Sequence, residues 1–311
     1  MAASNVSIRV VTPSFRGDFE RCAAMCASFD AFAEPAFHHQ VIVPRRDLAR
    51  FRDLANARRE VLCVEDVLPG FAFQLPVRKE RWLLGRWHRR GGWLVQQLVK
   101  VAAARPGGVD AVVFADSDIV LIRPLRAADF LEHGRVRLYR SGGTDHYRLD
   151  PNYPKWYRGA AQLLDIPIDD PYPAHFVGQL ESWAPEVVEA MCERIEQVSG
   201  RPWMEAVSRL TGGVGFSEYT TYGVFVDSGA AGAAERHFIA TRSLCHLSWN
   251  HDLGTRAGRD AFVAGLQPEA VAVLIQSNLK LPPPEWRALL EALTAADRDA
   301  PAHGRPAAGM P

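Results

Sequence analysis

Five consecutive apolar residues, Ala111 to Ala115, form the most constraining pattern in this sequence. A short unbroken apolar run is typical of a strand covered on both faces, as in the middle of a parallel sheet. The run ends at two aspartates, Asp116 and Asp118, with one serine between them. In open α/β sheets, ligands bind beyond the carboxyl ends of the strands. The run therefore predicts an α/β fold with two carboxylates at the binding edge.

Strand and helix patterns alternate through the first third of the chain. The β-branched segment Val6 to Val11 stops at the turn signal Thr12-Pro13-Ser14. Short strands are also predicted at Gln40 to Val43 and Val61 to Val64, with helical patterns between the strands. This alternation predicts a mostly parallel central sheet flanked by helices, folded as a single domain.

The rest of the chain mixes clear and weak signals. A helix is predicted from Trp93, and another has Pro185 near its start and Gly200 past its end. Residues 141–173 are rich in Gly, Pro, Tyr and Trp, which favours a long binding loop or lid. A helix is expected around residues 267–274, and a last amphipathic helix begins near Leu281.

The charge balance limits the classes of partner. The 311 residues include 36 Lys plus Arg and 36 Asp plus Glu, so the chain has no overall attraction for nucleic acid or an anionic membrane. No apolar run approaches the roughly 20 residues that span a bilayer, and no secretory signal pattern is present, so a cytoplasmic protein is expected. Five cysteines argue against a disulfide framework, and Cys22 and Cys26 share a helix face as buried thiols or as a metal or redox pair.

The aspartate pair has three interpretations. Two carboxylates one residue apart can converge on Mg²⁺ or Mn²⁺, or they can cap a helix or pair with arginines. The stretch DSDIV also fits the nucleophile loop of haloacid dehalogenase-type phosphohydrolases, in which Asp116 would attack phosphorus and Asp118 would be the acid/base. That loop normally follows the first strand of its core, whereas at least three strands come first here. No downstream strand ends in G-D-x-x-x-D.

Several motifs in order resemble the GT-A superfamily of nucleotide-sugar glycosyltransferases. They are the first strand ending in Thr-Pro-Ser, RGGWLVQQLVKVAAA before AVVFADSDIVLIRP, GFSEYTTYG, and the strand end CHLSW. The segment with W-x-x-Q-Q-x-x-K before D-x-D looks like a bacterial GT-A-like group that is distantly glycogenin-like. The resemblance covers roughly Val6 to His251. It implies a GT-A-like domain over residues 1–296, followed by a disordered tail at 297–311.

This resemblance implies a metal-dependent transfer of a sugar from a nucleotide-diphosphate sugar to a glycan or other hydroxyl acceptor. Asp118 would hold Mn²⁺ or Mg²⁺ against the donor diphosphate, and Asp116 would bind the metal or the donor ribose. His246 is the position that matches a later metal ligand in glycogenin-like members, with His251 as the alternative. A polysaccharide-assembly role rests on the resemblance alone. A non-catalytic relative that binds a nucleotide or glycan stays open beside it.

The donor half would be residues 1–125. Thr12 and Ser14 would contact the nucleotide and Asp18 could reach the base, although Ser14 or Asp18 could also cap the first helix. Gln97 and Lys100 share one helix face and are expected to bind the donor, where Lys100 could meet the diphosphate or a sugar hydroxyl. Three arginines in the preceding loop either approach the phosphates or lie in a solvated turn. They are Arg86, Arg89 and Arg90.

The acceptor half would be residues 126–296. An inverting enzyme needs a general base, and Glu218 among aromatic residues is the first choice. The alternative is that Glu218 is simply an acidic residue at the start of a helix. Glu218 and the metal-holding Asp116 are the predicted catalytic residues, and the residues expected to contact the acceptor sugar are Glu181, Tyr222 and Trp156, with Gln179, Tyr153, Tyr157 and Tyr219 as further candidates.

Overall fold

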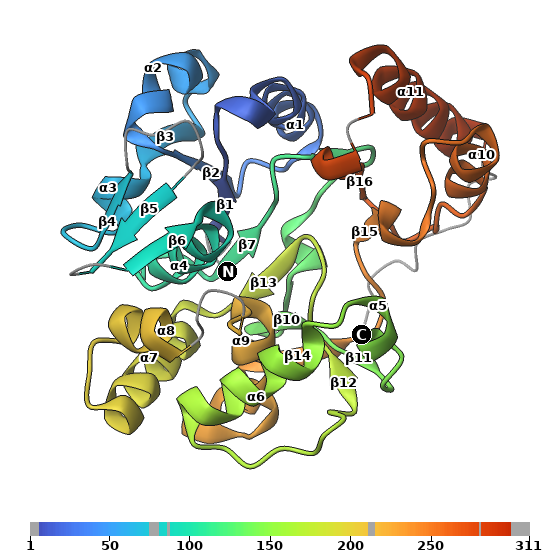
Figure 1. Cartoon of the computed structure of the whole chain (residues 1–311). Coiled ribbons are helices and arrows are strands. Elements are labelled where there is room, and N and C mark those ends of the chain that lie inside the picture. Colours follow the sequence, from blue (N-terminus) through green and yellow to red (C-terminus); the bar gives the residue numbers. More distant parts are fainter. Residues whose placement is uncertain (1–5, 75–80, 86–87, 211–214, 280, 300–311) are drawn as a thin grey trace, which may run out of the picture.

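The computed structural model describes residues 6–74, 81–85, 88–210, 215–279 and 281–299. Its centre is a five-stranded sheet in the order β13-β7-β1-β2-β3 (Figure 1). Strands β7, β1, β2 and β3 run parallel to one another. Strand β13, at one edge, is antiparallel to β7. The strands are β1 (Ile8–Pro13), β2 (Phe37–Val43), β3 (Arg59–Cys63), β7 (Ala111–Phe114) and β13 (Glu181–Trp183). The predicted α/β class, with a mostly parallel central sheet, is confirmed.

The apolar run in β7 is buried on both faces, as the sequence indicates. Val112 and Phe114 belong to one hydrophobic cluster, and Val113 and Ala115 belong to another on the opposite face. Successive side chains of a strand point to opposite faces, so a strand between two apolar layers has no polar position. Burial of this kind stabilises the fold by about 25 cal/mol per Å² of apolar surface removed from water.

Helices cover both faces of the sheet. Helix α1 lies over one face, while α4 packs on the other together with helices from the second half of the chain (Figure 1). The helices are α1 (Phe19–Phe32), α2 (Leu48–Phe51), α3 (Val64–Val67), α4 (Gly92–Ala104), α5 (His146–Leu149), α6 (Tyr153–Leu164), α7 (Pro185–Ser199), α8 (Trp203–Leu210), α9 (Glu218–Asp227), α10 (Arg256–Ala264) and α11 (Pro283–Asp299).

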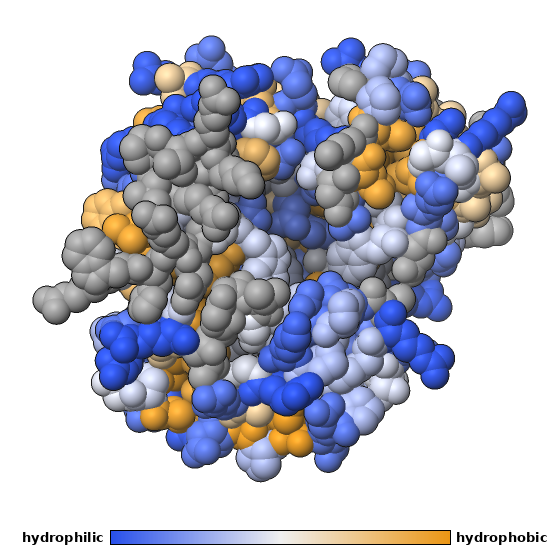
Figure 2. Space-filling model, in the orientation of Figure 1, coloured by the Kyte–Doolittle hydropathy of each residue, from blue (hydrophilic) through white to orange (hydrophobic). Residues whose placement is uncertain are grey.

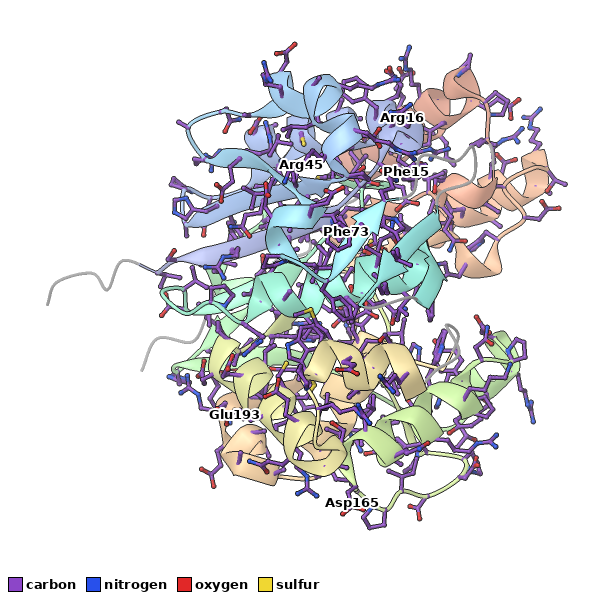
Figure 3. The ribbon with its side chains drawn as sticks, turned by 60° about the vertical axis from the view of Figure 1, so that its left-hand side comes forward. Phe15, Arg16, Arg45, Phe73, Asp165 and Glu193 are labelled. Carbon is purple, nitrogen blue, oxygen red and sulfur yellow. The ribbon has the colours of Figure 1, made fainter. Side chains whose placement is uncertain are left out.

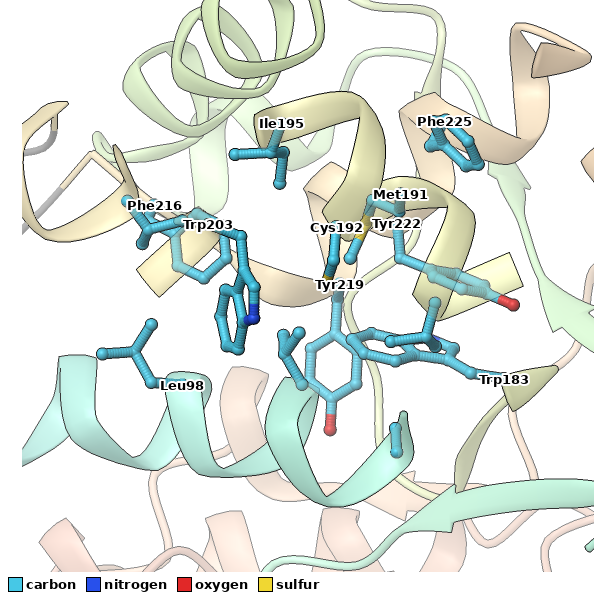
Figure 4. Close-up of a cluster of buried hydrophobic side chains, with 14 of the residues drawn as sticks. Leu98, Trp183, Met191, Cys192, Ile195, Trp203, Phe216, Tyr219, Tyr222 and Phe225 are labelled. Atoms are coloured by element: carbon cyan, nitrogen blue, oxygen red, sulfur yellow. The ribbon is translucent and has the colours of Figure 1, made fainter. Parts of the chain in front are cut away.

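The second half of the chain packs around α9, whose buried side chains meet α7, α8 and the inner face of α4 (Figure 4). Trp183 stacks on Tyr222 with ring centroids 4.4 Å apart. Helix α7 begins with Pro185 and ends at Gly200, which has a φ of 66°. Both ends of α7 are therefore as predicted. Figure 3 shows this part extending away from β1–β3, with Asp165 and Glu193 at its far end.

Short strands build four smaller sheets around the central one. Strand β8 follows the aspartate pair directly in the chain and pairs with β16. The aspartate pair therefore joins the central sheet to the sheet β15-β16-β8. The short strands are β4 (Ala72–Gln74), β5 (Arg81–Leu84), β6 (His88–Gly91), β8 (Ile119–Leu121), β9 (Leu131–Glu132), β10 (Arg135–Tyr139), β11 (Ser141–Gly142), β12 (Ala174–His175), β14 (His237–Ala240), β15 (Cys245–Leu247) and β16 (Ala272–Leu274).

Two predicted segments differ from the structure. Residues 141–173 are not one long loop, because helix α6 occupies their middle with Pro154 in its first turn. Residues 267–274 are not helical: β16 forms at their end and pairs with two strands. The last helix, α11, runs to Asp299, which is three residues into the segment expected to be a disordered tail; residues 300–311 lie outside the described residues.

All five cysteines are free and buried, in agreement with the expected absence of a disulfide framework. The thiols of Cys22 and Cys26 are neighbours inside the cluster under α1, and each shifts the pKa of the other. In the described part of the chain, no helix combines the length and the apolar composition that crossing a membrane requires.

We expect Gly159→Ala to destabilise the protein although alanine is the better helix former. A Cβ at residue 159 of α6 would lie 2.2 Å from the backbone oxygen of Gly215. Overpacking against backbone costs about 1–3 kcal/mol, which exceeds the gain in helix propensity. Thermal unfolding of Gly159→Ala should show a lowered Tm. Gly107→Ala is the matched control, because a Cβ there meets nothing within 4 Å. An unchanged Tm for Gly159→Ala would contradict the close packing of α6.

Candidate active site

The aspartate pair lies in the turn between β7 and β8, beside the carboxyl end of β1. The backbone N–H of Asp116 donates to Oε1 of Gln179 over 3.1 Å, and Nε2 of Gln179 donates to the Asp116 carboxylate. One carboxylate oxygen of Asp118 accepts the N–H of Ser277 over 2.8 Å. The two carboxylates are therefore fixed from the segment just before β13 and from the segment after β16.

Lys100 on α4 is buried against three side chains. Its ammonium nitrogen lies 3.0 Å from Oδ1 of Asp116, 3.2 Å from Oε1 of Glu218 and 3.0 Å from the hydroxyl of Tyr219. Burial alone would lower the pKa of Lys100, but the two carboxylates and the tyrosine raise it well above its usual value. Figure 4 shows the Tyr219 hydroxyl directed at α4. Lys100 is therefore a permanent buried cation.

Glu218, the predicted general base, does not form part of the wall of the cavity beside the aspartate pair. It is the first residue of α9, it is buried, and its carboxylate pairs with Lys100. Burial raises the pKa of Glu218, and the charge of Lys100 opposes that rise. Its backbone N–H donates to Oε1 of Gln97 over 3.1 Å. Glu218 is thus a helix-start residue that holds Lys100, and Gln97 joins α4 to α9 instead of facing a donor.

Negative charge accumulates around the pair. Burial and the charge of Asp116 raise the pKa of Asp118 to about 6. Burial first, and then Asp116, also raise the pKa of Asp18 despite the nearby Arg21. Asp18 occupies the N-cap position of α1 but makes no capping hydrogen bond with its side chain. Asp18, Asp116 and Asp118 therefore face one another closely enough for each to feel the others' charge.

A cavity of about 360 Å³ opens beside the aspartate pair. Figure 2 shows this face of the molecule hollowed near its middle, where hydrophilic residues gather. The cavity walls combine carboxylates with large aromatic rings. They are formed by Trp93, Asp116, Asp118, Asp150, Tyr153, Trp156, Val177, Gln179, Trp249, Leu274 and Gln276. Among the residues expected to bind an acceptor, Trp156 is on this wall, as are the further candidates Tyr153 and Gln179.

Two residues expected at the nucleotide do not present their hydroxyls to the cavity. Thr12 is fully buried, and its hydroxyl is hydrogen-bonded to Nε2 of His39 over 2.9 Å. Ser14 is 5% exposed, and its hydroxyl neighbours the thiol of Cys22. Both side chains turn inward because β1 is central, with an apolar layer on each face. Of the side chains expected to bind the donor at the end of β1, only Asp18 lies with the aspartates.

Two residues expected at the acceptor are in the core instead. Tyr222 is fully buried; its hydroxyl accepts the N–H of Ala184 over 2.9 Å and is hydrogen-bonded to Nε2 of His237 over 2.8 Å. Glu181 is also buried, and burial raises its pKa to about 8 although Arg137 opposes the rise. Neither side chain forms part of the cavity wall. Both interpretations as sugar contacts therefore fail on burial.

The structure does not bring His246 to the aspartates. Its Nε2 is hydrogen-bonded to the carbonyl oxygen of Phe262 over 2.8 Å, and its ring stacks on Phe262 at 4.4 Å. The ring of His251 lies 6.0 Å from it against the same phenylalanine. Within the described residues, no group of three His, Cys, Asp or Glu side chains surrounds a possible metal position. The prediction of a histidine as third metal ligand is thus not supported.

Three loop arginines from the sequence analysis give no information here. Arg86 lies outside the described residues, and so do the side chains of Arg89 and Arg90. The wall residues that were not singled out individually from the sequence include Asp150 and Trp93. Asp150 lies in a segment interpreted as a loop, and Trp93 was taken only as a helix start. Their signal was weak, because an isolated Asp or Trp has no diagnostic spacing.

Residues 5–297 match the model of a family of unknown function, DUF6492. The chain belongs to this family. No curated protein matches the sequence.

Solved structures similar to this DUF6492 chain include mouse xyloside xylosyltransferase 1 in its apo form, with 10% identity, a TM-score of 0.45, and coverage of 89% of this chain and 100% of that one. Another is the active-site mutant Q189E of LgtC, with 10% identity, a TM-score of 0.46, and coverage of 92% and 95%. The first is a glycosyltransferase by name, the class that the sequence motifs resemble. Similarity at this level does not carry an activity over to the DUF6492 chain.

We expect Asp118→Asn to stabilise the metal-free protein at pH 7. The folded-state pKa of Asp118, about 6, lies above its usual 3.8, so its carboxylate costs stability increasingly as pH rises through this window. That cost is on the order of 2 kcal/mol, and asparagine removes it while still accepting the Ser277 N–H. Thermal unfolding in chelator should show a higher Tm for the variant at pH 7 and a vanishing difference near pH 4.

Asp47→Asn is the matched control with the opposite sign. Asp47 is also buried, but its carboxylate accepts from Nε of Arg16 over 2.6 Å. Its loss leaves a partner unpaired and should lower Tm. If Asp118→Asn lowered Tm as well, the electrostatic description of the pair would be wrong.

Proposed function

We propose that this chain is a metal-dependent glycosyltransferase that uses a nucleotide-diphosphate sugar. The observation that carries the proposal is the carboxylate pair Asp116 and Asp118, in which Lys100 pairs with Asp116 but not with Asp118, on a cavity wall at the carboxyl end of the central strand β7. Burial raises the pKa of Asp118, and the charge of Asp116 adds to that rise because two ionised carboxylates in this position repel each other. A divalent cation removes that repulsion.

The donor set fits Mg²⁺ or Mn²⁺. These ions commonly take one or two protein carboxylates, with the remaining positions supplied by phosphate oxygens and water. Asp118 has one oxygen on the Ser277 N–H, and Asp116 is 38% exposed at its side chain. Asp18 adds a third negative charge nearby. When bound, the metal would neutralise the diphosphate and stabilise the charge that develops on the leaving oxygen.

The charge balance of the described side chains supports a cation here. Carboxylates around the pair outnumber the cations Lys100 and Arg21. A nucleoside diphosphate is itself an anion, so this cavity would repel it without a bound metal. The carboxylates in question are Asp18, Asp116, Asp118, Asp150 and Glu218.

Lys100 acts in this proposal as a positioning residue. Its ammonium holds one oxygen of Asp116 and leaves the other to Gln179. The Asp116 carboxylate is therefore fixed in rotation before any ligand arrives, which reduces the reorganisation that binding requires. Glu218 pairs with the same lysine, so the position of Lys100 is also fixed relative to the start of α9.

The proton of the acceptor hydroxyl needs another base than Glu218. Asp150 is the carboxylate that the described cavity wall offers outside the aspartate pair. We assign it the role of proton acceptor. The acceptor oxygen then forms its bond to the sugar carbon, and the bond to the diphosphate oxygen breaks with its electrons leaving on the nucleotide.

The phosphohydrolase alternative is less well supported. The aspartate pair follows β7, and the chain has already formed three parallel strands of the same sheet before it. A phosphoaspartate enzyme would use Asp116 as nucleophile, but that carboxylate is held between Lys100 and Gln179. Release of phosphate from an aryl phosphate with a phosphorylated Asp116 would establish it instead.

We expect one of UDP, GDP, CDP or dTDP to raise the Tm only when Mn²⁺ is present. Mass action gives about 2.7 kcal/mol of stabilisation at a hundredfold excess over Kd. Asp118→Asn should abolish the metal-dependent shift, since it removes a charged ligand. Asp260→Asn, at a carboxylate 71% exposed on α10, is the control and should keep it. A full shift in Asp118→Asn would refute the metal role of the pair.

We expect Asp150→Asn to lower transfer by about 10²-fold or more and to leave the nucleotide shift intact. Loss of a positioned base affects turnover, whereas the donor is bound through other residues. Glu218→Gln is the comparison: it keeps the fold contacts of α9 but weakens the hold on Lys100. Turnover is measured by nucleotide release with glycan acceptors. Equal turnover in Asp150→Asn and the unmodified chain would assign the base elsewhere.

A further inference from the structure

Trp93 exposes a large apolar ring to solvent on the wall of the cavity, and exposed apolar surface is unfavourable in water. It lies in the first turn of α4, is 42% exposed, and forms part of the cavity wall. A tryptophan held only for packing would be covered, as Trp183 and Trp203 are at 1% exposure. The ring of Trp93 therefore offers an apolar face to whatever enters the cavity.

A second tryptophan supports that face from another helix. The rings of Trp93 and Trp156 stack with centroids 6.0 Å apart and an interplanar angle of 23°. Trp156 belongs to α6 and is 9% exposed. The pair bridges two helices that are far apart in the sequence. Stacking fixes the orientation of Trp93, so little side-chain entropy remains to be lost on binding.

Tyr153 extends the aromatic wall and is itself held in place. Its ring meets Trp156 edge to face at 4.8 Å, and its hydroxyl is hydrogen-bonded to Nε2 of His175 over 2.6 Å. The hydroxyl is thus already used within the protein. What the three rings contribute to the cavity is apolar surface with a fixed shape.

Asp150 supplies a polar edge beside these rings. It lies on the same cavity wall, three residues before Tyr153 along the chain. One of its oxygens accepts the N–H of Asn152 over 2.8 Å, which orients the carboxylate. A carboxylate accepts hydrogen bonds from hydroxyl groups at either oxygen.

We propose that Trp93, Trp156 and Asp150 form a carbohydrate subsite that binds the acceptor as a pyranose ring. The C–H face of the sugar packs on the tryptophan rings, and a hydroxyl donates to Asp150. A purely apolar ligand would satisfy the rings alone, and a small polar ion would satisfy the carboxylate alone. A sugar ring has both kinds of surface. This inference deepens the proposed glycosyltransferase function and names its acceptor class.

The test is direct binding of defined sugars to the full chain. Cellobiose, lactose, maltose and N,N′-diacetylchitobiose are the probes, measured by saturation-transfer NMR from the aromatic protons and by titration for Kd. We expect at least one probe to bind with millimolar affinity. Trp93→Ala should weaken it at least tenfold, while Trp93→Phe, which keeps a ring, should lose less. Phe73→Ala is the control, since Phe73 is 51% exposed but lies on β4 outside the cavity.

Asp150→Ala tests the polar edge separately. It should weaken the same sugar about tenfold, because a hydrogen bond to a charged group is lost. The subsite is overturned if none of the four probes binds, or if binding is unchanged in Trp93→Ala. Metal-dependent nucleotide binding is measured in parallel. Nucleotide binding without sugar binding would overturn this subsite and leave the proposed function standing. Sugar binding without nucleotide binding would support this subsite and overturn the proposed function.

Discussion

The ammonium of Lys100 is the contact on which the arrangement of the site depends. It is buried, and it reaches one carboxylate from the β7–β8 turn and one from the start of α9. A buried charge is expensive unless it is paired and hydrogen-bonded, so each partner is held as firmly as the lysine itself. Through this one group the central sheet, α4 and the helices of the second half of the chain share a fixed geometry.

That fixed geometry leaves the neighbouring carboxylates unbalanced. Lys100 is fully occupied by Asp116, Glu218 and Tyr219, so it does not neutralise Asp118. Arg21 is near enough to Asp18 and Asp118 to feel their charges, and it also donates to the carbonyl oxygen of Ile275. Burial and then the charge of Asp116 raise the pKa of Asp118. A bound cation would remove this cost at the cavity wall, which is the basis of the proposed metal site.

How much the sequence could predict depends on whether a residue's role is local. The apolar run of β7, the proline and glycine at the ends of α7, and the position of the aspartate pair were all readable, because strand burial and helix ends are short-range properties. Helix α6 was missed because Pro154 and its aromatic neighbours suggested a loop. Pro154 fits the first helical turn, and the aromatic residues form the buried side of an amphipathic helix.

The site residues that were misplaced share one cause. Thr12, Tyr222 and Glu181 are polar residues in apolar surroundings, a pattern that fits a pocket wall as well as a satisfied core position. Only the tertiary partners decide: His39 takes the hydroxyl of Thr12, and Ala184 and His237 take that of Tyr222. The expected histidine ligand failed for a related reason, since Phe262 on α10 binds its ring nitrogen.

One face of α4 connects the two halves of the cavity. Trp93, Gln97 and Lys100 are spaced at i, i+4 and i+7, which places them on the same side of the helix. Trp93 lies on the cavity wall, Gln97 binds the first amide of α9, and Lys100 binds Asp116. Because an α-helix is rigid over two turns, the distance between the aromatic wall and the aspartate pair is set by the helix itself. The sequence pattern W-x-x-x-Q-x-x-K therefore holds an apolar surface and a charged one at a constant separation, as the proposed transfer between a bound sugar and a bound diphosphate would require.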